Sequence, residues 1–282
     1  MRYTLCTAAL KSSRWIWNSL RDARTLDMQL GEESITDFFL MNLRRWAPHP
    51  LKIKTFTKRE EATSGGDWEW WFTGPSAQWL GIRVQAKVIK LSTNHFEHLH
   101  YNPKGGPSQC KRLEQDAFNN RMLPAYCLYT NWLSADNKML ARLSGRRVFR
   151  RTEYGAALVS VDHVAALQKL GHHKLEQIVP YMKPFRELFC TAKYTEQELP
   201  QLVFRNITGM YPLAGSFDDR RWTESETVHW FQYANREQFF VRADAPVYVY
   251  RLLQSDIGTL ELNELDQNID RITVFQQTAS LA

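Results

Sequence analysis

The sequence has few cysteines and no long apolar run, and both absences narrow the possibilities. Its four cysteines include no Cys-x-x-Cys pair, and none lies beside a histidine at the spacing of a zinc site. We therefore expect four reduced thiols, as in cytoplasmic proteins. No segment approaches the ~20 apolar residues of a membrane helix, and no signal peptide is visible. We expect a cytoplasmic location and no membrane partner.

The sequence also lacks a glycine-rich phosphate loop and a nucleophile elbow, so nothing supports a small-molecule enzyme built on either motif. It contains 44% hydrophobic residues, among them ten tryptophans, and its net charge is +6. A chain of 282 residues with this composition can form a proper hydrophobic core. The positive charge permits attraction to nucleic-acid phosphates without requiring it.

Residues 65–90 predict a β-hairpin around which the chain is organised. The segment 67–72 alternates between two faces, as a strand does. Gly74 and Pro75 predict the turn. Residues 80–91 are rich in β-branched and apolar side chains and predict the second strand.

Polar side chains occupy one face of this hairpin. Asp67 and Glu69 are two residues apart on the first strand, and Gln85 and Lys87 are two residues apart on the second. Two acids, an amide and an amine are unusual choices for inward positions of a core hairpin. These four residues are therefore the candidate site, and an Asp67–Lys87 salt bridge without chemistry is the alternative.

The elements around the hairpin predict an α/β (α+β) fold with a mixed central sheet flanked by helices. A capping box that begins at Ser34 predicts the start of the helix before the hairpin. The expected order is given by residue ranges: helix 7–27, helix 34–46, strand 51–57, the hairpin, helix 108–122, strand 125–130, strand 156–161 and a helix from Asp162. The tail offers three further strands, 239–242, 247–252 and 272–275. We divide the chain into a domain of residues 1–200 and a C-terminal extension of residues 201–282.

An acid on one strand followed by Gln-x-Lys on the next resembles the PD-(D/E)xK nuclease superfamily, in the Asp…Gln-x-Lys variant found in Mrr-type restriction endonucleases. The resemblance covers residues 30–135. It implies a restriction-endonuclease-like core, with Asp67, Gln85 and Lys87 as catalytic residues.

The resemblance also implies a glutamate on the opening helix that reaches the metal. Glu32 precedes Ile35 and Phe39 by three and seven residues and so shares their helical stripe, whereas Glu33 does not. Both acids also suit a helix N-terminus without any catalytic role, because they interact favourably with the helix dipole. Glu32 and Glu33 therefore both remain candidates. The family often carries a polar residue on the helix after the lysine strand, and Gln109 is the candidate here; an exposed residue at the helix start, without a role in the site, is the equal alternative.

The implied cofactor is Mg²⁺ or Mn²⁺. Such cations prefer hard oxygen ligands, which Asp67, Gln85 and Glu32 would supply, with Glu69 as a further candidate ligand. Lys87 would orient the attacking water or stabilise charge that develops on the phosphate.

The resemblance thus implies a metal-dependent nuclease of restriction or phage-defence character. DNA is the expected substrate, RNA is not excluded, and a homodimer or an activating partner protein would fit such a role. The alternative is a non-catalytic nucleic-acid- or protein-binding module that keeps the fold, for which the neutral Gln85 leaves room.

Overall fold

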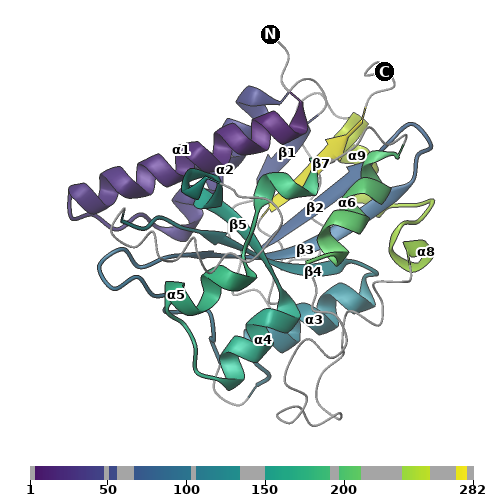
Figure 1. The fold of residues 1–282 in the computed structure, drawn as a ribbon. Helices are drawn as coiled ribbons and strands as arrows, with labels where there is room; N and C mark the ends of the chain where they lie inside the picture. Colours follow the sequence, from purple (N-terminus) through teal and green to yellow (C-terminus); the bar gives the residue numbers. More distant parts are fainter. Residues whose placement is uncertain are drawn as a thin grey trace.

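A mixed β-sheet forms the centre of the computed structural model, which describes residues 4–47, 51–55, 67–102, 106–133, 150–190, 197–210, 237–254 and 271–277 (Figure 1). Within these ranges the sheet has seven strands in the order β1-β7-β2-β3-β4-β5-β6. The strands are β1 (Leu51–Thr55), β2 (Trp68–Thr73), β3 (Trp79–Val88), β4 (Leu123–Tyr129), β5 (Ala156–Ser160), β6 (Lys183–Pro184) and β7 (Arg271–Gln276).

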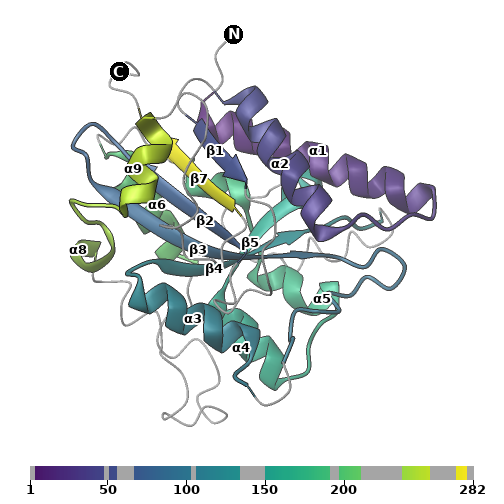
Figure 2. The same ribbon diagram turned by 180° about the vertical axis from the view of Figure 1, so that it is seen from behind.

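Helices cover both faces of the sheet (Figures 1 and 2). One face lies under α1 and α2, and the other lies under α3 and α4. The helices are α1 (Leu5–Thr25), α2 (Glu32–Trp46), α3 (Gln109–Asn119), α4 (Val161–Lys169), α5 (Leu175–Ile178), α6 (Leu199–Thr208), α8 (Glu237–Phe240) and α9 (Val247–Gln254), with short 3₁₀ turns η2 (Arg151–Gly155), η3 (Val179–Tyr181) and η4 (Phe185–Leu188). The predicted mixed sheet flanked by helices is confirmed. Among the described residues, no helix has the length and apolar character needed to span a membrane.

The hairpin of β2 and β3 is antiparallel and is buried on both faces. On the face towards α2, Trp68 packs edge-on against Phe39, and Trp70 packs edge-on against Phe185. The opposite face carries the polar positions of both strands. β3 then pairs in parallel with β4, and α3 makes the crossover between them.

β7 lies inside the sheet, although it comes from the tail that the sequence assigned to a C-terminal extension. It pairs in parallel with β2 and antiparallel with β1, and so separates two strands that are consecutive in the chain. Its residues Ile272 and Val274 are fully buried. At least this part of residues 201–282 therefore belongs to the main core.

Two other strands predicted in the tail are wrong. Residues 237–240 form α8 and residues 247–254 form α9, where strands 239–242 and 247–252 were expected. Aromatic and β-branched side chains favoured a strand locally, but Val249 and Leu252, three residues apart, are both buried on one side of α9. A helix meets this tertiary demand and overrides the local preference. The last two residues of predicted strand 51–57 lie outside the described residues.

The start of α2 also differs from its prediction. The helix begins at Glu32 with Gly31 as its N-cap, and Ser34 lies inside the first turn instead of capping it. Acidic side chains are favourable in a first turn because they interact with the positive end of the helix dipole. Glu32 and Glu33 supply that charge, so the helix extends back to include both.

The expectation of four reduced cysteines is wrong for one pair. A disulfide joins Cys6 of α1 to Cys190, which follows η4, with their Cα atoms 5.3 Å apart. The two residues are 184 positions apart in the chain, so no spacing pattern could indicate the bond. Cys110 and Cys127 are free and buried. Cysteine chemistry therefore no longer supports a cytoplasmic location.

The position of β7 between β1 and β2 can be tested by substitution of a charged residue into this strand. We expect Val274→Asp to lower the free energy of unfolding by at least ~3 kcal/mol, because an unpaired carboxylate would be buried. Gln276→Asp, at the half-buried end of the same strand, is the control and should cost much less. The measurement is urea unfolding followed by tryptophan fluorescence. A Val274→Asp protein whose tryptophans unfold as in the wild type would mean that the tail is independent of the sheet.

Candidate functional site

The candidate site lies where β2 begins and β3 ends. Asp67 immediately precedes β2, and its backbone N–H donates to the carbonyl of Val84 at 2.9 Å, which extends the ladder by one step. This pairing sets Asp67 beside Gln85 on the face that also carries Lys87. Alternation along two paired strands therefore brings the predicted residues together.

Asp67 is held by β3 through a side-chain and a backbone contact. Its Oδ2 accepts hydrogen bonds from the Gln85 amide Nε2 and, at 3.1 Å, from the backbone N–H of Ala86. Gln85 is only 1% exposed. The carboxylate of Asp67 thus has a fixed orientation, and its Oδ2 is the atom that β3 holds.

Gln109 completes this chain of amides from the first position of α3. Its Nε2 donates to Gln85 Oε1 at 2.9 Å. Ser108 caps α3 by accepting from the Lys111 N–H, which fixes the start of the helix beside the sheet. The polar residue expected on this helix therefore does contact the site.

Glu32 reaches the same place from the first turn of α2. Its Oε2 lies 3.8 Å from the Nζ of Lys87, whose side chain is largely buried. Glu32 also makes a hydrogen bond to the Asp67 side chain and one to the Val88 backbone. Two carboxyl groups and one ammonium group therefore share a small, partly buried volume.

This crowding alters the acidity of Glu32. Burial raises the pKa of its carboxyl from the ordinary 4.5 to about 7. The Lys87 charge lowers that pKa, and the neighbouring Asp67 raises it. Near neutral pH, partial protonation of Glu32 therefore reduces the repulsion between the two carboxyl groups.

Two of the predicted residues are not part of this group. Glu33 is exposed beside Glu32 on the first turn of α2. Glu69 shares the face of Asp67, but its carboxylate pairs with Arg83 at 3.0 Å, and both side chains are 1% exposed. Glu69 also accepts from Trp71 and Tyr248. Its carboxylate is thus committed to another cluster, and we leave Glu69 out of the candidate metal ligands.

Two charged residues beside the site were not predicted: Arg83 Nε and Asp116 Oδ2 lie 2.8 Å apart. A signal for both was present. Arg83 lies two residues before Gln85 on the same face of its strand, and Asp116 lies seven residues after Gln109, two helical turns along α3.

The chemistry of the donor set suits a hard cation only in part. Glu32 and Asp67 offer carboxylate oxygens, but Gln85 turns its amide oxygen towards Gln109 and its amino group towards Asp67. Cation binding at Gln85 would therefore require a half-turn of its amide, or use of the Ala86 carbonyl beside it. Within the described ranges, no group of three or more Asp, Glu, His or Cys side chains is arranged to hold a metal ion.

Comparison with known proteins gives a family. Residues 5–280 match the family of unknown function DUF6615. The chain belongs to this family. No curated protein and no solved structure matches it. The residues that match DUF6615 make up nearly the whole chain and include both the hairpin and β7.

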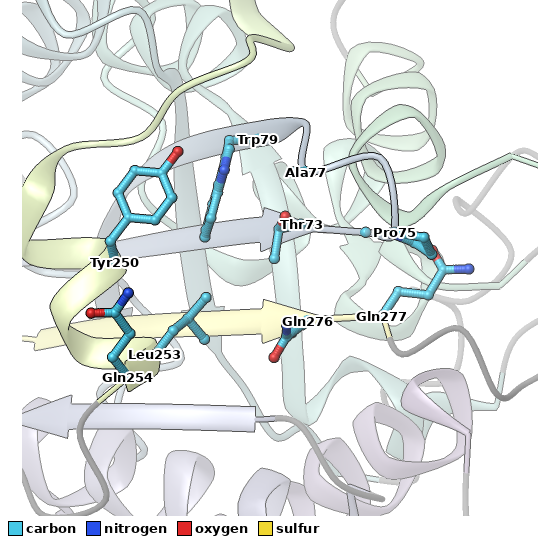
Figure 3. Close-up of a pocket in the computed structure, with 10 residues that line it drawn as sticks. Thr73, Pro75, Ala77, Trp79, Tyr250, Leu253, Gln254, Gln276 and Gln277 are labelled. Carbon is cyan, nitrogen blue, oxygen red and sulfur yellow. The ribbon is translucent and has the colours of Figure 1, made fainter.

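A cavity of about 470 Å³ lies at the opposite end of the same hairpin (Figure 3). Gly74, which lines it, comes seven positions after Asp67, a span of roughly 23 Å along a strand. None of the described residues that line it is charged; they are Thr73, Gly74, Pro75, Ala77, Trp79, Tyr250, Leu253, Gln254, Gln276 and Gln277. The two ends of the hairpin therefore differ in chemistry, because the lining of the cavity is uncharged and the Asp67 end brings Asp67, Glu32 and Lys87 together.

The raised pKa of Glu32 predicts a pH-dependent stability. Below pH ~4.5 the carboxyl is protonated in both the folded and the unfolded chain. Between pH 4.5 and about 7 the folded chain keeps this proton while the unfolded chain loses it, so this group's contribution to stability falls as pH rises. Above pH ~7 the loss is complete and constant.

We therefore expect Glu32→Gln to be more stable than the wild type at pH 8, with a difference that shrinks to nothing near pH 4. The measurement is urea unfolding across this range in a chelating buffer. Glu33→Gln is the control at the adjacent exposed position. The same pH dependence in both variants would assign the effect to the helix terminus in general rather than to the contact with Asp67.

Proposed function

We propose that the chain is a metal-dependent nuclease that hydrolyses phosphodiester bonds at the Asp67 site. The observation that carries the proposal is the contact between the carboxyl groups of Glu32 and Asp67, with Lys87 Nζ 3.8 Å from Glu32. Two carboxylates repel each other, and a divalent cation between them would relieve that repulsion. The raised pKa of Glu32 agrees with this repulsion, because burial and the neighbouring Asp67 both disfavour a second negative charge there.

Glu32 and Asp67 would hold Mg²⁺ or Mn²⁺, assisted by the oxygen of Gln85 or the Ala86 carbonyl. Such a cation supplies a bound water of lowered pKa and neutralises charge on the phosphate. The two carboxylates come from different elements, α2 and the start of β2, so the folded chain is needed to bring them together.

Lys87 would act on the reacting phosphate. Its side chain is 10% exposed, so its ammonium acts in surroundings with little water, where a charge has a larger effect. Glu32 orients this ammonium towards the carboxylates. The N-termini of α2 and α3 add partial positive charge at the same end of the sheet, which favours an anionic substrate.

Gln85 and Gln109 would act as a positioning pair for Asp67. Gln109 holds the oxygen of Gln85 at 2.9 Å, and Gln85 presents its amino group to Asp67. Removal of Gln85 would leave Asp67 Oδ2 with the Ala86 N–H alone, and removal of Gln109 would free the Gln85 amide to rotate. We assign to these two residues a role in holding the ligand carboxylate.

We also propose that the fold belongs to the restriction-endonuclease-like class. The order α2, β2–β3 hairpin, α3, β4 agrees with the order that the PD-(D/E)xK resemblance implies, and β3 and β4 are parallel across the α3 crossover. This resemblance favours DNA as the substrate, with RNA as the alternative, and a role in restriction or phage defence. A homodimer or an activating protein would fit such a role.

One observation favours a second candidate, a non-catalytic nucleic-acid- or protein-binding module. Gln85 is neutral, and its amino group donates to Asp67, so this carboxylate has a hydrogen-bond partner other than a cation. A module that had lost cleavage could keep the hairpin in this state. The pairing of Lys87 with Glu32 weighs against it, because burial of an ammonium and a carboxyl group side by side costs stability that a binding surface does not require.

Mutation of the lysine separates the two functions. We expect Lys87→Ala to reduce cleavage by ~100- to 1,000-fold, the usual loss when one preorganised charge is removed. Binding of nucleic acid should remain, because contacts to the phosphate backbone are spread over many groups. The assay is cleavage of plasmid and single-stranded substrates with Mg²⁺ or Mn²⁺, beside a chelator.

Lys90→Ala is the matched control. Lys90 lies three residues further along, and its Nζ pairs with Glu97 at 2.6 Å on the surface, away from the carboxylates. Its loss should leave the rate nearly unchanged. Equal cleavage by wild type and Lys87→Ala would place the activity elsewhere, and no cleavage by any protein on any substrate would favour the binding module.

Asp67→Ala should be as severe as the lysine variant, for another reason. Its loss removes one of two carboxylates that hold the cation, so the variant should need more metal. We expect an excess of Mn²⁺ to restore part of the rate to Asp67→Ala and none to Lys87→Ala. The measurement is the cleavage rate as a function of metal concentration. Restoration of both variants to the same degree would contradict these separate roles.

A further inference from the structure

A buried ion-pair network lies beside the candidate site, on the same face of the sheet. Arg83 Nη1 is 3.0 Å from Glu69 Oε1, and Arg83 Nε is 2.8 Å from Asp116 Oδ2. Arg83 and Glu69 are almost completely buried, and the Asp116 side chain is mostly so. The network therefore links β2, β3 and α3 through three charged groups in the interior.

The second oxygen of Glu69 is held from two further directions. Glu69 Oε2 accepts from Trp71 Nε1 at 2.8 Å and from the Tyr248 hydroxyl of α9 at 2.7 Å. These bonds leave Oε1 to face Arg83. The side chain of Glu69 is thus fixed, and it in turn fixes the guanidinium.

Stability alone is a weak reason for this network. Burial of each charge costs several kcal/mol, and apolar residues of similar volume often replace such groups without loss of stability. The paired atoms lie at ion-pair distance, so their attraction offsets part of that cost.

Its place in the structure gives a better reason. Arg83 is two residues before Gln85 on β3, and Asp116 is two helical turns after Gln109 on α3. The pairs Arg83–Asp116 and Gln85–Gln109 are therefore successive links between the same strand and the same helix. The first link fixes how far α3 can slide or turn, and the second lies at the candidate site.

We infer that the Glu69–Arg83–Asp116 network positions the site, because it fixes α3 at the register in which Gln109 holds the amide of Gln85. This inference rests on the proposed function, and it adds three positioning residues that touch neither substrate nor cation. The network acts through Gln109 and Gln85 on the orientation of Asp67. A displacement of about 1 Å in such a support can cost up to ~100-fold in rate.

The test is Asp116→Asn, which keeps the shape and removes the charge. We expect kcat with Mn²⁺ to fall about 10- to 100-fold while KM changes little. The side-chain amide NMR signals of Gln85 and Gln109, assigned with Gln→Glu variants, should shift. Asp22→Asn removes one partner of an exposed ion pair with Arg21 and is the control, which should change neither quantity.

A triple variant, Glu69→Gln with Arg83→Met and Asp116→Leu, separates positioning from folding. We expect it to melt near the wild-type temperature, because no buried charge is left unpaired and the amide oxygen at position 69 still accepts from Trp71 and Tyr248. We also expect it to keep the low kcat and the shifted amide signals. This variant also decides the matter if Asp116→Asn fails to fold. Wild-type kcat and unshifted signals in the triple variant would overturn the inference.

The NMR measurement tests the positioning role separately from nuclease activity, because it does not require cleavage. If the wild type cleaves nothing, shifted Gln85 and Gln109 signals in Asp116→Asn, but not in Asp22→Asn, would still support positioning while the nuclease proposal fails. Unshifted signals in Asp116→Asn would overturn the positioning role whether or not the protein cleaves.

Discussion

Two strands that are covered on both faces carry ionisable side chains, and this constraint governs the centre of the molecule. β2 and β3 are buried along nearly their whole length, yet they contain Glu69, Arg83 and Lys87. A charge in such a place must have a partner, because desolvation without one costs far more than packing returns. The partners come from α2, α3 and α9, so charge pairing fixes the placement of these helices as much as apolar packing does.

The choice of an amide at position 85 bears on this constraint. A carboxylate there would have been a third negative group beside Asp67 and Glu32. Gln85 instead donates to Asp67 and accepts from Gln109, so it lowers the repulsion and extends the hydrogen bonding. The arrangement can therefore persist without a cation. The same substitution reduces the negative charge with which a cation could be attracted.

The sequence predicted what depends on short-range periodicity. Alternation over residues 67–72 and 80–91 indicated the hairpin and the shared face of Asp67, Gln85 and Lys87. Helical spacing favoured Glu32 over Glu33, and the structure brings Glu32 to the site and leaves Glu33 exposed.

Features decided by distant parts of the chain were not predictable in this way. The Cys6–Cys190 disulfide, the helical form of α9 and the ion pair of Arg83 with Asp116 each depend on a partner that a local pattern does not specify. Glu69 illustrates the limit most clearly. The face of the strand on which it lies was predicted correctly. Its carboxylate, however, forms an ion pair with Arg83, and for that reason we do not include it among the candidate ligands.

The position of β7 has a consequence for how the sheet can form. Trp68 on β2 donates a hydrogen bond to Thr273 on β7, 205 residues further along the chain. Because β7 lies between β1 and β2 and is made so late, this part of the sheet cannot close while the ribosome is still making the preceding segments. Until then β2 has one unpaired edge, and an unpaired edge readily accepts a strand from another molecule. The chain therefore faces a long interval of exposure during synthesis, and slow closure of a contact so distant in sequence lengthens it further.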